Sequence, residues 1–500
     1  MHCGRCRGAR ANKGVPPQAE GSGVHLMSVI DAHSPGGGPR RVVFFGFRRP
    51  LNQEALSRAL GQRRPERVHL VSRSDFLGPL KDEFLLARNG FRACTFEANH
   101  FQAFPPGPFL EAMRHHEAVA LRMYERIFRG AFSGQSHRMR RSLYLQHVAY
   151  AYGLLVDGGY EAVVFSEIPH HPFAYVLHSV ALLLELDVRF FAQFQVKDSY
   201  VVASAIPEMF QAFGSELTRM QNAGEREELQ EQTRAEVARR SGEHQPFYMG
   251  TSDLTPSRRL YMWSKRFFRA DDRLRIIRTV RNALAYRSAR RPEPTTGEPF
   301  IYFPLHLQPE ATTSPMGGAY VDQYLALETL VRALPQGWKI VIKENPVQKF
   351  AKRDLGFYEH LGSLDSVHLV SRKIDTFGLI ERCKAIATIT GTAGWEALFK
   401  GKPAVVFGHA FYRDAPGVIA VESVEDLATE LGRVANGSFK AATPEQLVEF
   451  LGAVQRHSFH GVMDTAYLRD SDLSFDEAVN RYTMVLADYL EGRDLHHSQT

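Results

Sequence analysis

The sequence contains little cysteine and no long hydrophobic run. Only four of its 500 residues are cysteines, which argues against a disulfide-stabilised scaffold and indicates a reducing compartment. Cys3 and Cys6 form a single CxxC pair and lack the second pair of ligands that a structural zinc site needs. The longest apolar stretch, residues 174–184, is interrupted by His178. It is much shorter than the roughly 20 residues that cross a bilayer.

Charge of one sign is also scarce. The chain has 61 Lys and Arg against 55 Asp and Glu, a net charge of +6. No dense basic stripe with interleaved aromatic residues is present, so we expect no nucleic-acid partner. The mild surplus suits nucleotide phosphates or an anionic membrane surface. Residues 1–40 lack the apolar core of a signal peptide and read as a disordered tail, so we expect a cytoplasmic protein, with peripheral attachment to the inner membrane as an option.

What the sequence does contain is an alternation of strand and helix patterns, which predicts parallel sheets. The fold class we expect is therefore α/β, with two Rossmann-like domains, a helical insertion and C-terminal helices that pack back onto the first domain. The expected boundaries are a first domain at 41–204, an insertion and linker at 205–297, a second domain at 298–436 and the C-terminal helices at 437–500.

The second domain has the clearer pattern of strands and helices. Polar loops follow its strands, where ligands bind in open α/β sheets. The expected strands are 301–305, 339–343, 367–370, 385–389 and 404–407, and the expected helices are 321–333, 375–383, 393–400 and 423–435.

The best candidate site in this domain is the turn at residues 389–394, Ile-Thr-Gly-Thr-Ala-Gly. It joins a buried strand to a helix, and we expect Thr392 to cap that helix through its hydroxyl. Gly391 and Gly394 would let a ligand approach the backbone, while Thr390, Thr392 and the exposed N–H groups, that of Ala393 included, would bind an anion. The same residues also fit an ordinary tight turn before a capped helix.

Three further loops follow strands of the same domain. One carries His306, Gln308 and Glu310, and another carries His409. In the third, Lys343 could meet a phosphate and Glu344 a ribose or sugar hydroxyl. Each has a purely structural alternative, namely a polar surface loop, an ordinary turn or an ion pair between Lys343 and Glu344. Finding several polar loops at the strand ends of one domain is, however, less expected by chance than finding a single one.

Two segments outside this domain also carry candidate chemistry. Glu167, His170 and His171 follow the expected strand 162–165, where a carboxylate or imidazole could deprotonate an acceptor hydroxyl. A structural loop with a proline-fixed turn is the alternative there. The basic run at 287–291, Arg-Ser-Ala-Arg-Arg, could touch anionic lipid or a partner. It could also be an ordinary solvated helix face.

Taken together, the segments 303–313, 322–323, 343–346, 391–397 and 401–403 resemble the capsule polysaccharide biosynthesis family, which includes bacterial Kdo transferases. The resemblance covers about residues 298–415, and in the first domain only 167–170. It implies a GT-B glycosyltransferase. From the loops and the resemblance together, we expect Glu167 and His170 to be catalytic. The expected donor-binding residues are His306, Gln308, Glu310, Lys343, Glu344, Asn345, Thr390, Gly391, Thr392, Ala393, Gly394, Glu396 and His409.

The resemblance also implies the partners. A nucleotide-sugar donor, with a CMP-linked sugar as one candidate, would lie against the second domain, and a glycan or glycolipid acceptor would enter from the first. Asn345-Pro346 stands where related enzymes often carry His-Pro, and an amide can donate a hydrogen bond but cannot become cationic. We expect neither a metal nor a cofactor.

Two other functions stay compatible with the sequence. One is a polyol-phosphate transferase on the same fold, which would use a CDP-linked donor. The other is a non-catalytic subunit that binds polysaccharide or nucleotide and helps assembly or export.

Overall fold

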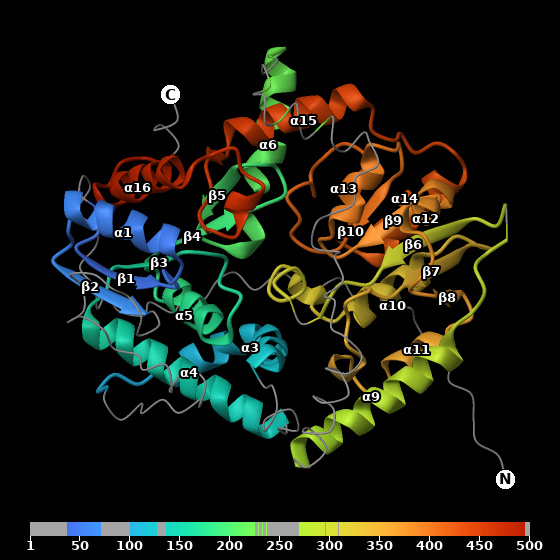
Figure 1. Cartoon of the computed structure of the whole chain (residues 1–500), viewed down its shortest axis with the longest axis horizontal. Helices are drawn as coiled ribbons and strands as arrows, with labels where there is room; N and C mark the ends of the chain where they lie inside the picture. Colours follow the sequence, from blue (N-terminus) through green and yellow to red (C-terminus); the bar gives the residue numbers. More distant parts are fainter. Residues whose placement is uncertain are drawn as a thin grey trace, which may run out of the picture. The chain divides into compact units, whose positions relative to one another are not determined.

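The computed structural model describes residues 38–71, 101–127, 137–225, 270–295, 297–308 and 310–495, together with residues 229, 233 and 237. Two six-stranded sheets organise this part of the chain (Figure 1). Nearly all of the expected tail, with Cys3 and Cys6, and most of residues 226–269 lie outside the described residues. The expected α/β fold with two Rossmann-like sheets is confirmed.

The first sheet has the strand order β12-β5-β4-β3-β1-β2. Its strands β2, β1, β3 and β4 are parallel, and β5 and β12 join antiparallel at the other edge. The strands are β1 (Arg41–Phe45), β2 (Arg67–Val71), β3 (Ala162–Phe165), β4 (Asp187–Gln193), β5 (Ser199–Ala203) and β12 (Phe459–His460). The helices of this region are α1 (Pro50–Gln62), α3 (Gly107–Ile127), α4 (His137–Gly158), α5 (Pro172–Leu183), α6 (Gln211–Ala223) and α16 (Phe475–Leu490).

The second sheet is entirely parallel, in the order β11-β10-β9-β6-β7-β8. Its strands are β6 (Phe300–Pro304), β7 (Lys339–Lys343), β8 (Val367–Val370), β9 (Ala385–Thr388), β10 (Ala404–Val406) and β11 (Val418–Ala420). The remaining helices are α9 (Ala270–Ala289), α10 (Gln323–Ala333), α11 (Phe357–Ser363), α12 (Thr376–Arg382), α13 (Thr392–Leu398), α14 (Val424–Ala435) and α15 (Pro444–Arg456).

The strands form where apolar runs can be buried on both faces, as parallel sheets require. In β1, Val42, Val43 and Phe44 are at most 1% exposed. The strand ends at Gly46, whose φ of +87° favours glycine. A Cβ atom there would also lie 2.8 Å from the Ser166 hydroxyl oxygen. Gly46 thus brings the loop after β1 close to the loop after β3.

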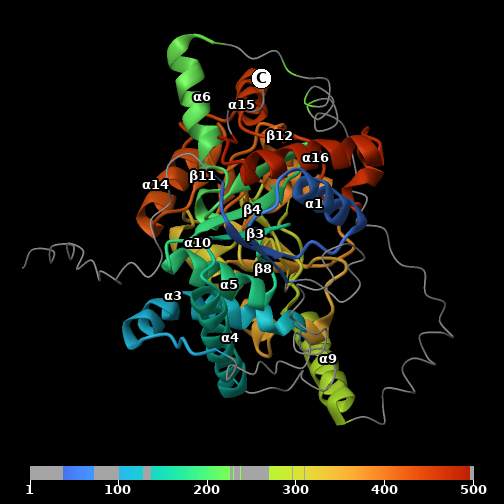
Figure 2. The ribbon, with the colours of Figure 1, turned by 90° about the vertical axis from the view of Figure 1, so that its left-hand side faces the viewer.

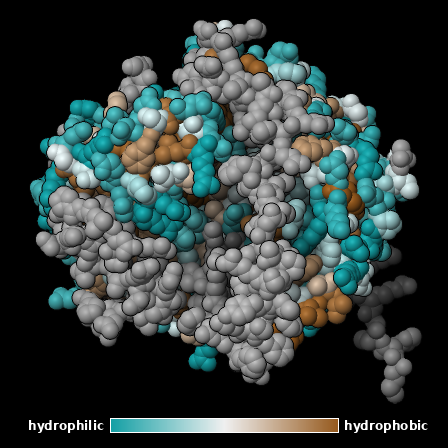
Figure 3. All heavy atoms as spheres, in the orientation of Figure 1, coloured by the Kyte–Doolittle hydropathy of each residue, from teal (hydrophilic) through white to brown (hydrophobic). Residues whose placement is uncertain are grey.

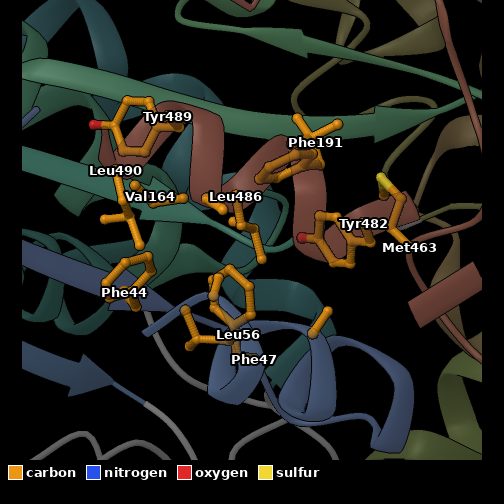
Figure 4. Close-up of a cluster of buried hydrophobic side chains, with 14 of the residues drawn as sticks. Phe44, Phe47, Leu56, Val164, Phe191, Met463, Tyr482, Leu486, Tyr489 and Leu490 are labelled. Atoms are coloured by element: carbon orange, nitrogen blue, oxygen red, sulfur yellow. The ribbon is translucent and has the colours of Figure 1, made fainter. Parts of the chain in front are cut away.

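Helix α16 completes the first sheet although it comes from the end of the chain. It lies beside α1 on one face of the sheet (Figure 2), and α3, α4 and α5 cover the other face. Figure 4 shows Tyr482 and Leu486 of α16 packed into a cluster with Phe47, Leu56 and Phe191. The end of the chain is therefore part of the hydrophobic core of the first sheet.

Three strands were not expected from the sequence. The strands β11 and β12 have only three and two residues, too few to show a period. The strand β5, with five residues, pairs antiparallel with β4 at the end of the first sheet. By contrast, every strand expected in the second domain lies within one residue of its observed bounds. No helix of the described residues is long and apolar enough to cross a membrane.

The packing of α16 predicts a large difference between two neighbouring positions. Leu486 is fully buried, whereas Met484 is 62% exposed on the same helix. We expect Leu486→Ala to lower the free energy of unfolding by about 2–5 kcal/mol, because it leaves a cavity in the core. Met484→Ala is the matched control and should change it by less than about 0.5 kcal/mol. Urea denaturation measures both, and equal effects would contradict the core position of α16.

Candidate functional site

The second sheet brings two of the expected loops together at its topological switch point. Strand β6 lies between β7 and β9, and the chain passes from β6 to β7 and β8 before it returns to β9. The loops after β6 and β9 therefore leave the carboxyl edge side by side, which is where α/β sheets bind ligands. His306 lies in the first loop, and the turn at 389–394 forms the second.

His306 shapes the turn through its own ring. Its Nε2 atom accepts a hydrogen bond from the Ile389 N–H at 3.2 Å and lies 2.8 Å from the Thr388 hydroxyl oxygen. That oxygen in turn accepts from the Gly391 N–H at 2.9 Å. Burial lowers the pKa of His306 to about 4, and the charge of Arg353 acts in the same direction. The imidazole is therefore neutral near pH 7, with Nε2 as an acceptor and the proton on Nδ1.

The two glycines of the turn are required by the protein's own packing. A Cβ atom on Gly391 would lie 2.7 Å from the Thr388 hydroxyl oxygen, and one on Gly394 would lie 2.5 Å from the Tyr412 hydroxyl oxygen. Gly391 is also the N-cap residue of α13, and Thr392 is the first helical residue. The expectation that Thr392 caps this helix was wrong, because the chain is still extended at Gly391.

The two threonines of the turn differ in their contacts: Thr390 is hydrogen-bonded within the protein, whereas Thr392 has a hydroxyl that a ligand could use. Thr390 is 4% exposed, and its hydroxyl donates to the Thr312 carbonyl oxygen at 2.7 Å. Thr392 and Ala393 are half-buried at the start of α13, as is Glu396 one turn later. Among the described residues, the Thr392 hydroxyl and the N–H groups of Thr392 and Ala393 make no hydrogen bond. These three donors are the part of the turn that a ligand could use.

Lys343 lies at the end of β7 and holds a neighbouring loop. Its Nζ atom donates to the Ile374 carbonyl oxygen and to the Thr376 hydroxyl, both at 2.6 Å. Burial lowers the pKa of Lys343, and the carboxylate of Asp375 opposes that shift. The ammonium group therefore positions the start of α12, and a phosphate would have to share it with these two oxygens.

Glu344 is a structural residue, which corrects its expected role at a ribose or sugar hydroxyl. Its side chain is fully buried, and its carboxylate forms a bidentate pair with Arg353 at 2.7 and 2.9 Å. It also accepts from the Tyr358 hydroxyl at 2.6 Å and from the Asn345 N–H at 2.8 Å. Both oxygens are thus occupied within the core, and the partner of Glu344 is Arg353 and not Lys343.

The other expected donor-site residues range from structural to accessible. Gln308 donates to the Val321 carbonyl oxygen at 3.1 Å and accepts from Arg353 at 3.0 Å, so it cross-links loops. The Asn345 side-chain oxygen accepts from the Val347 N–H at 3.1 Å in a local turn. Glu310 and His409 are half-buried, and burial lowers the pKa of His409. Glu310 and His409 are the better placed of these four for a ligand.

A second site lies at the switch point of the first sheet. The loops after β1 and β3 line a pocket of about 180 Å³. Glu167, 32% exposed, accepts from Arg48 at 2.8 Å. The Nδ1 atom of His170 lies 2.9 Å from the Ile168 carbonyl oxygen. A carbonyl can only accept, so Nδ1 carries the proton and Nε2 of the neutral ring is the basic atom.

The same pocket contains a set of side chains that could hold a metal ion. The ligand atoms of Glu167, His170 and His171 lie within 4.8 Å of one another. Arg48 already contacts two of these groups, because its Nη2 atom also lies 3.2 Å from His171 Nε2. A guanidinium can only donate, so this His171 nitrogen accepts and is unprotonated. A cation bound by all three groups would displace Arg48 from both contacts.

Arg48 and Arg353 were missed by the sequence reading. Arg48 is three residues past the end of β1, and His306 is two residues past the end of β6, so the place of Arg48 in the chain was an available signal. Arg353 lies in a charged stretch nine residues after Glu344. No local pattern distinguishes its side chain, which is 1% exposed, from those of solvated arginines.

The buried pair predicts that Arg353 contributes strongly to stability. Arg353→Met leaves the Glu344 carboxylate without its cation, and we expect a loss of about 3–5 kcal/mol in the free energy of unfolding. Arg433→Ala is the control, because its pair with Glu430 is exposed and should contribute less than about 1 kcal/mol. Urea denaturation of both variants tests this, and similar losses would show that the Arg353–Glu344 pair behaves as a surface pair.

Comparison with known proteins finds a family that the second-sheet region resembles. Residues 275–448 match the family model described as capsule polysaccharide biosynthesis protein. No curated protein matches the chain. Among solved structures, the KpsC β-Kdo 2,7-transferase of Thermosulfurimonas dismutans is 14% identical, with 73% of this chain and 95% of that chain covered and a TM-score of 0.27. The UDP-GlcNAc 2-epimerase of Methanocaldococcus jannaschii is 11% identical, with 83% and 98% covered and a TM-score of 0.24. Over residues 275–448, about a third of its length, this chain is therefore similar to the capsule polysaccharide biosynthesis family.

Proposed function

We propose that the protein is a glycosyltransferase of capsular polysaccharide biosynthesis, which moves a sugar from a nucleotide-activated donor to a glycan or glycolipid acceptor. The observation that carries the proposal is the convergence of His306 and the turn at 389–394 at the switch point of the second sheet. This convergence lies inside the segment that matches the capsule family. Fixed donors at such a point suit a leaving group whose negative charge grows during the reaction.

The donor phosphate is proposed to lie against the start of α13. The Thr392 hydroxyl and the N–H groups of Thr392 and Ala393 would donate to it, while the hydrogen bonds of His306 and Thr388 hold the turn in place. Because these donors are fixed before the ligand binds, little reorganisation is needed when charge develops. Glu310 and His409 would contact the rest of the donor.

The acceptor is proposed to bind at the pocket of the first sheet, with Glu167 as the general base. Arg48 orients the Glu167 carboxylate through the 2.8 Å contact to Oε1. The second oxygen would take the proton of the acceptor hydroxyl as its oxygen attacks the anomeric carbon, and the bond to the nucleotide phosphate breaks. His170, with its basic Nε2 atom, would assist in orienting the hydroxyl.

Ligand binding tests the donor site. We expect one of CMP, CDP, UDP, GDP or their sugar conjugates to raise the midpoint of thermal unfolding. A ligand at 100 times its Kd adds about 2.7 kcal/mol of stability. Thr392→Val should reduce this shift without changing the midpoint of the free protein, because the Thr392 hydroxyl has no partner among the described residues.

Thr429→Val on the exposed face of α14 is the matched control and should leave the ligand shift intact. If no nucleotide shifts the midpoint, the transferase proposal fails and a non-catalytic assembly role gains support. If the Thr392→Val variant still shows the ligand shift, the transferase proposal stands, but Thr392 does not contact the phosphate.

Catalysis tests Glu167. With the donor that the binding screen identifies, Glu167→Gln should lower kcat by about 10²–10⁴, the usual contribution of a general base. The nucleotide-induced thermal shift should not change, since the donor binds at the second sheet. The control is Glu208→Gln, which alters an exposed carboxylate near α6. Full activity of Glu167→Gln would rule out Glu167 as the base.

A further inference from the structure

Helix α9 presents an apolar stripe to solvent. The side chains of Ile277, Val280 and Leu284 are 62%, 52% and 59% exposed. They follow one another at spacings of three and four, so they lie on one face of the helix. Isolated exposed apolar residues are ordinary, but three in register along one helix are the pattern of an interaction surface. Figure 3 shows hydrophobic atoms at the lower right, where Figure 1 places α9.

The opposite face of α9 is fixed to the second sheet. Asn282 is fully buried and donates to the carbonyl oxygens of Phe350 and Arg353 at 2.8 and 3.0 Å. Arg278 donates to the same Arg353 carbonyl oxygen, and the Tyr286 hydroxyl donates to the Val370 carbonyl oxygen at 3.2 Å. Rotation of the helix to bury the stripe would break these bonds. The stripe is therefore held outward by the fold.

Arginines flank the stripe and leave it with a positive surplus. Three of the arginines of this region have acidic partners: Arg278 with Asp354 at 3.4 Å, Arg281 with Glu359 at 3.6 Å and Arg291 with Asp365 at 3.8 Å. Arg287 and Arg290 are exposed and have no carboxylate within 4 Å among the described residues. Arg287 lies one turn beyond Leu284. Arg290 directly follows the helix, and its guanidinium carbon lies 5.8 Å from the centre of the Tyr286 ring, on the side of the helix away from the stripe.

We propose that this face of α9 docks onto an anionic lipid surface. Ile277, Val280 and Leu284 would enter the boundary between headgroups and acyl chains, while Arg287 would bind a lipid phosphate. A local apolar stripe with an arginine at its end suits contact with a membrane interface, where apolar side chains enter the headgroup boundary and the cation meets anionic lipid. From Ile277 to Arg287 the contact would extend roughly 15 Å along the helix. Charge complementarity favours lipid over a second copy of the chain, since the face that a copy would bring is also positive.

Flotation of the full chain with lipid vesicles tests the proposal. We expect binding to vesicles of phosphatidylcholine with phosphatidylglycerol, and little binding to phosphatidylcholine alone. The triple variant Ile277→Ser, Val280→Ser and Leu284→Ser should lose at least about tenfold in binding, as apolar burial drives insertion. The variant Arg287→Gln should lose about fivefold in binding and become less sensitive to salt.

The control replaces three apolar residues that are similarly exposed on other helices, Met139, Leu145 and Met484, by serine. It should bind vesicles as the unmodified protein does. All changes are at exposed positions, and circular dichroism checks that the variants fold. Absence of binding, equal binding to both vesicle types, or binding that survives the stripe variant would each overturn the proposal. A dimer in light scattering that the stripe variant disperses would assign the face to a second copy instead.

The docking proposal and the transferase proposal fail separately. The nucleotide-induced thermal shift is measured without lipid and depends on the turn before α13. Vesicle binding is measured without nucleotide and depends on α9. Loss of one result leaves the other interpretable.

Discussion

The buried ion pair between Arg353 and Glu344 is the interaction on which the site of the second sheet depends. The guanidinium of Arg353 contacts Glu344 at the end of β7, Gln308 at 3.0 Å and the His306 carbonyl oxygen at 2.9 Å. The carbonyl oxygen of the same residue accepts from α9 through Asn282. One residue thus fixes the loop after β6 and the helix behind it. A lysine has no planar fork of donors and could not make these contacts together.

The contacts of Arg353 also determine the geometry of the turn at 389–394, because they hold His306. Because the backbone of His306 is held by Arg353, its ring is placed to accept from Ile389 and to meet Thr388. The donors at the start of α13 therefore owe their arrangement to a buried charge pair that touches no ligand. The charge of Arg353 also helps to keep the ring neutral, which preserves Nε2 as an acceptor near neutral pH. Stability and site geometry are thus coupled in this sheet.

The sequence predicted the positions of the loops better than the roles of single side chains. Strand ends follow from apolar runs and from residues such as Gly46, so the loops that carry His306 and Thr392 could be placed from local pattern. The role of Glu344 could not, because its partner Arg353 is chosen by tertiary packing. The short strand β12 was equally hidden, since it forms only where residues 459–460 meet β5.

The first sheet repeats the plan of the second with a different central group. In both, a residue shortly after the first strand of the sheet contacts the end of the neighbouring strand across the switch point, or the loop after that strand. In the second sheet that residue is His306, whose neutral ring accepts a hydrogen bond from the Ile389 N–H within the protein. In the first sheet it is Arg48, a permanent cation that pairs with Glu167 and contacts His171 at 3.2 Å.

Glu167, His170 and His171 alone could serve as metal ligands. The Arg48 guanidinium contacts Glu167 and His171, so it would repel a divalent ion and already occupies one oxygen of the Glu167 carboxylate. Proton transfer needs only the second oxygen of Glu167. The position of Arg48 therefore supports the proposed role of Glu167 as a base more than a metal site in this pocket.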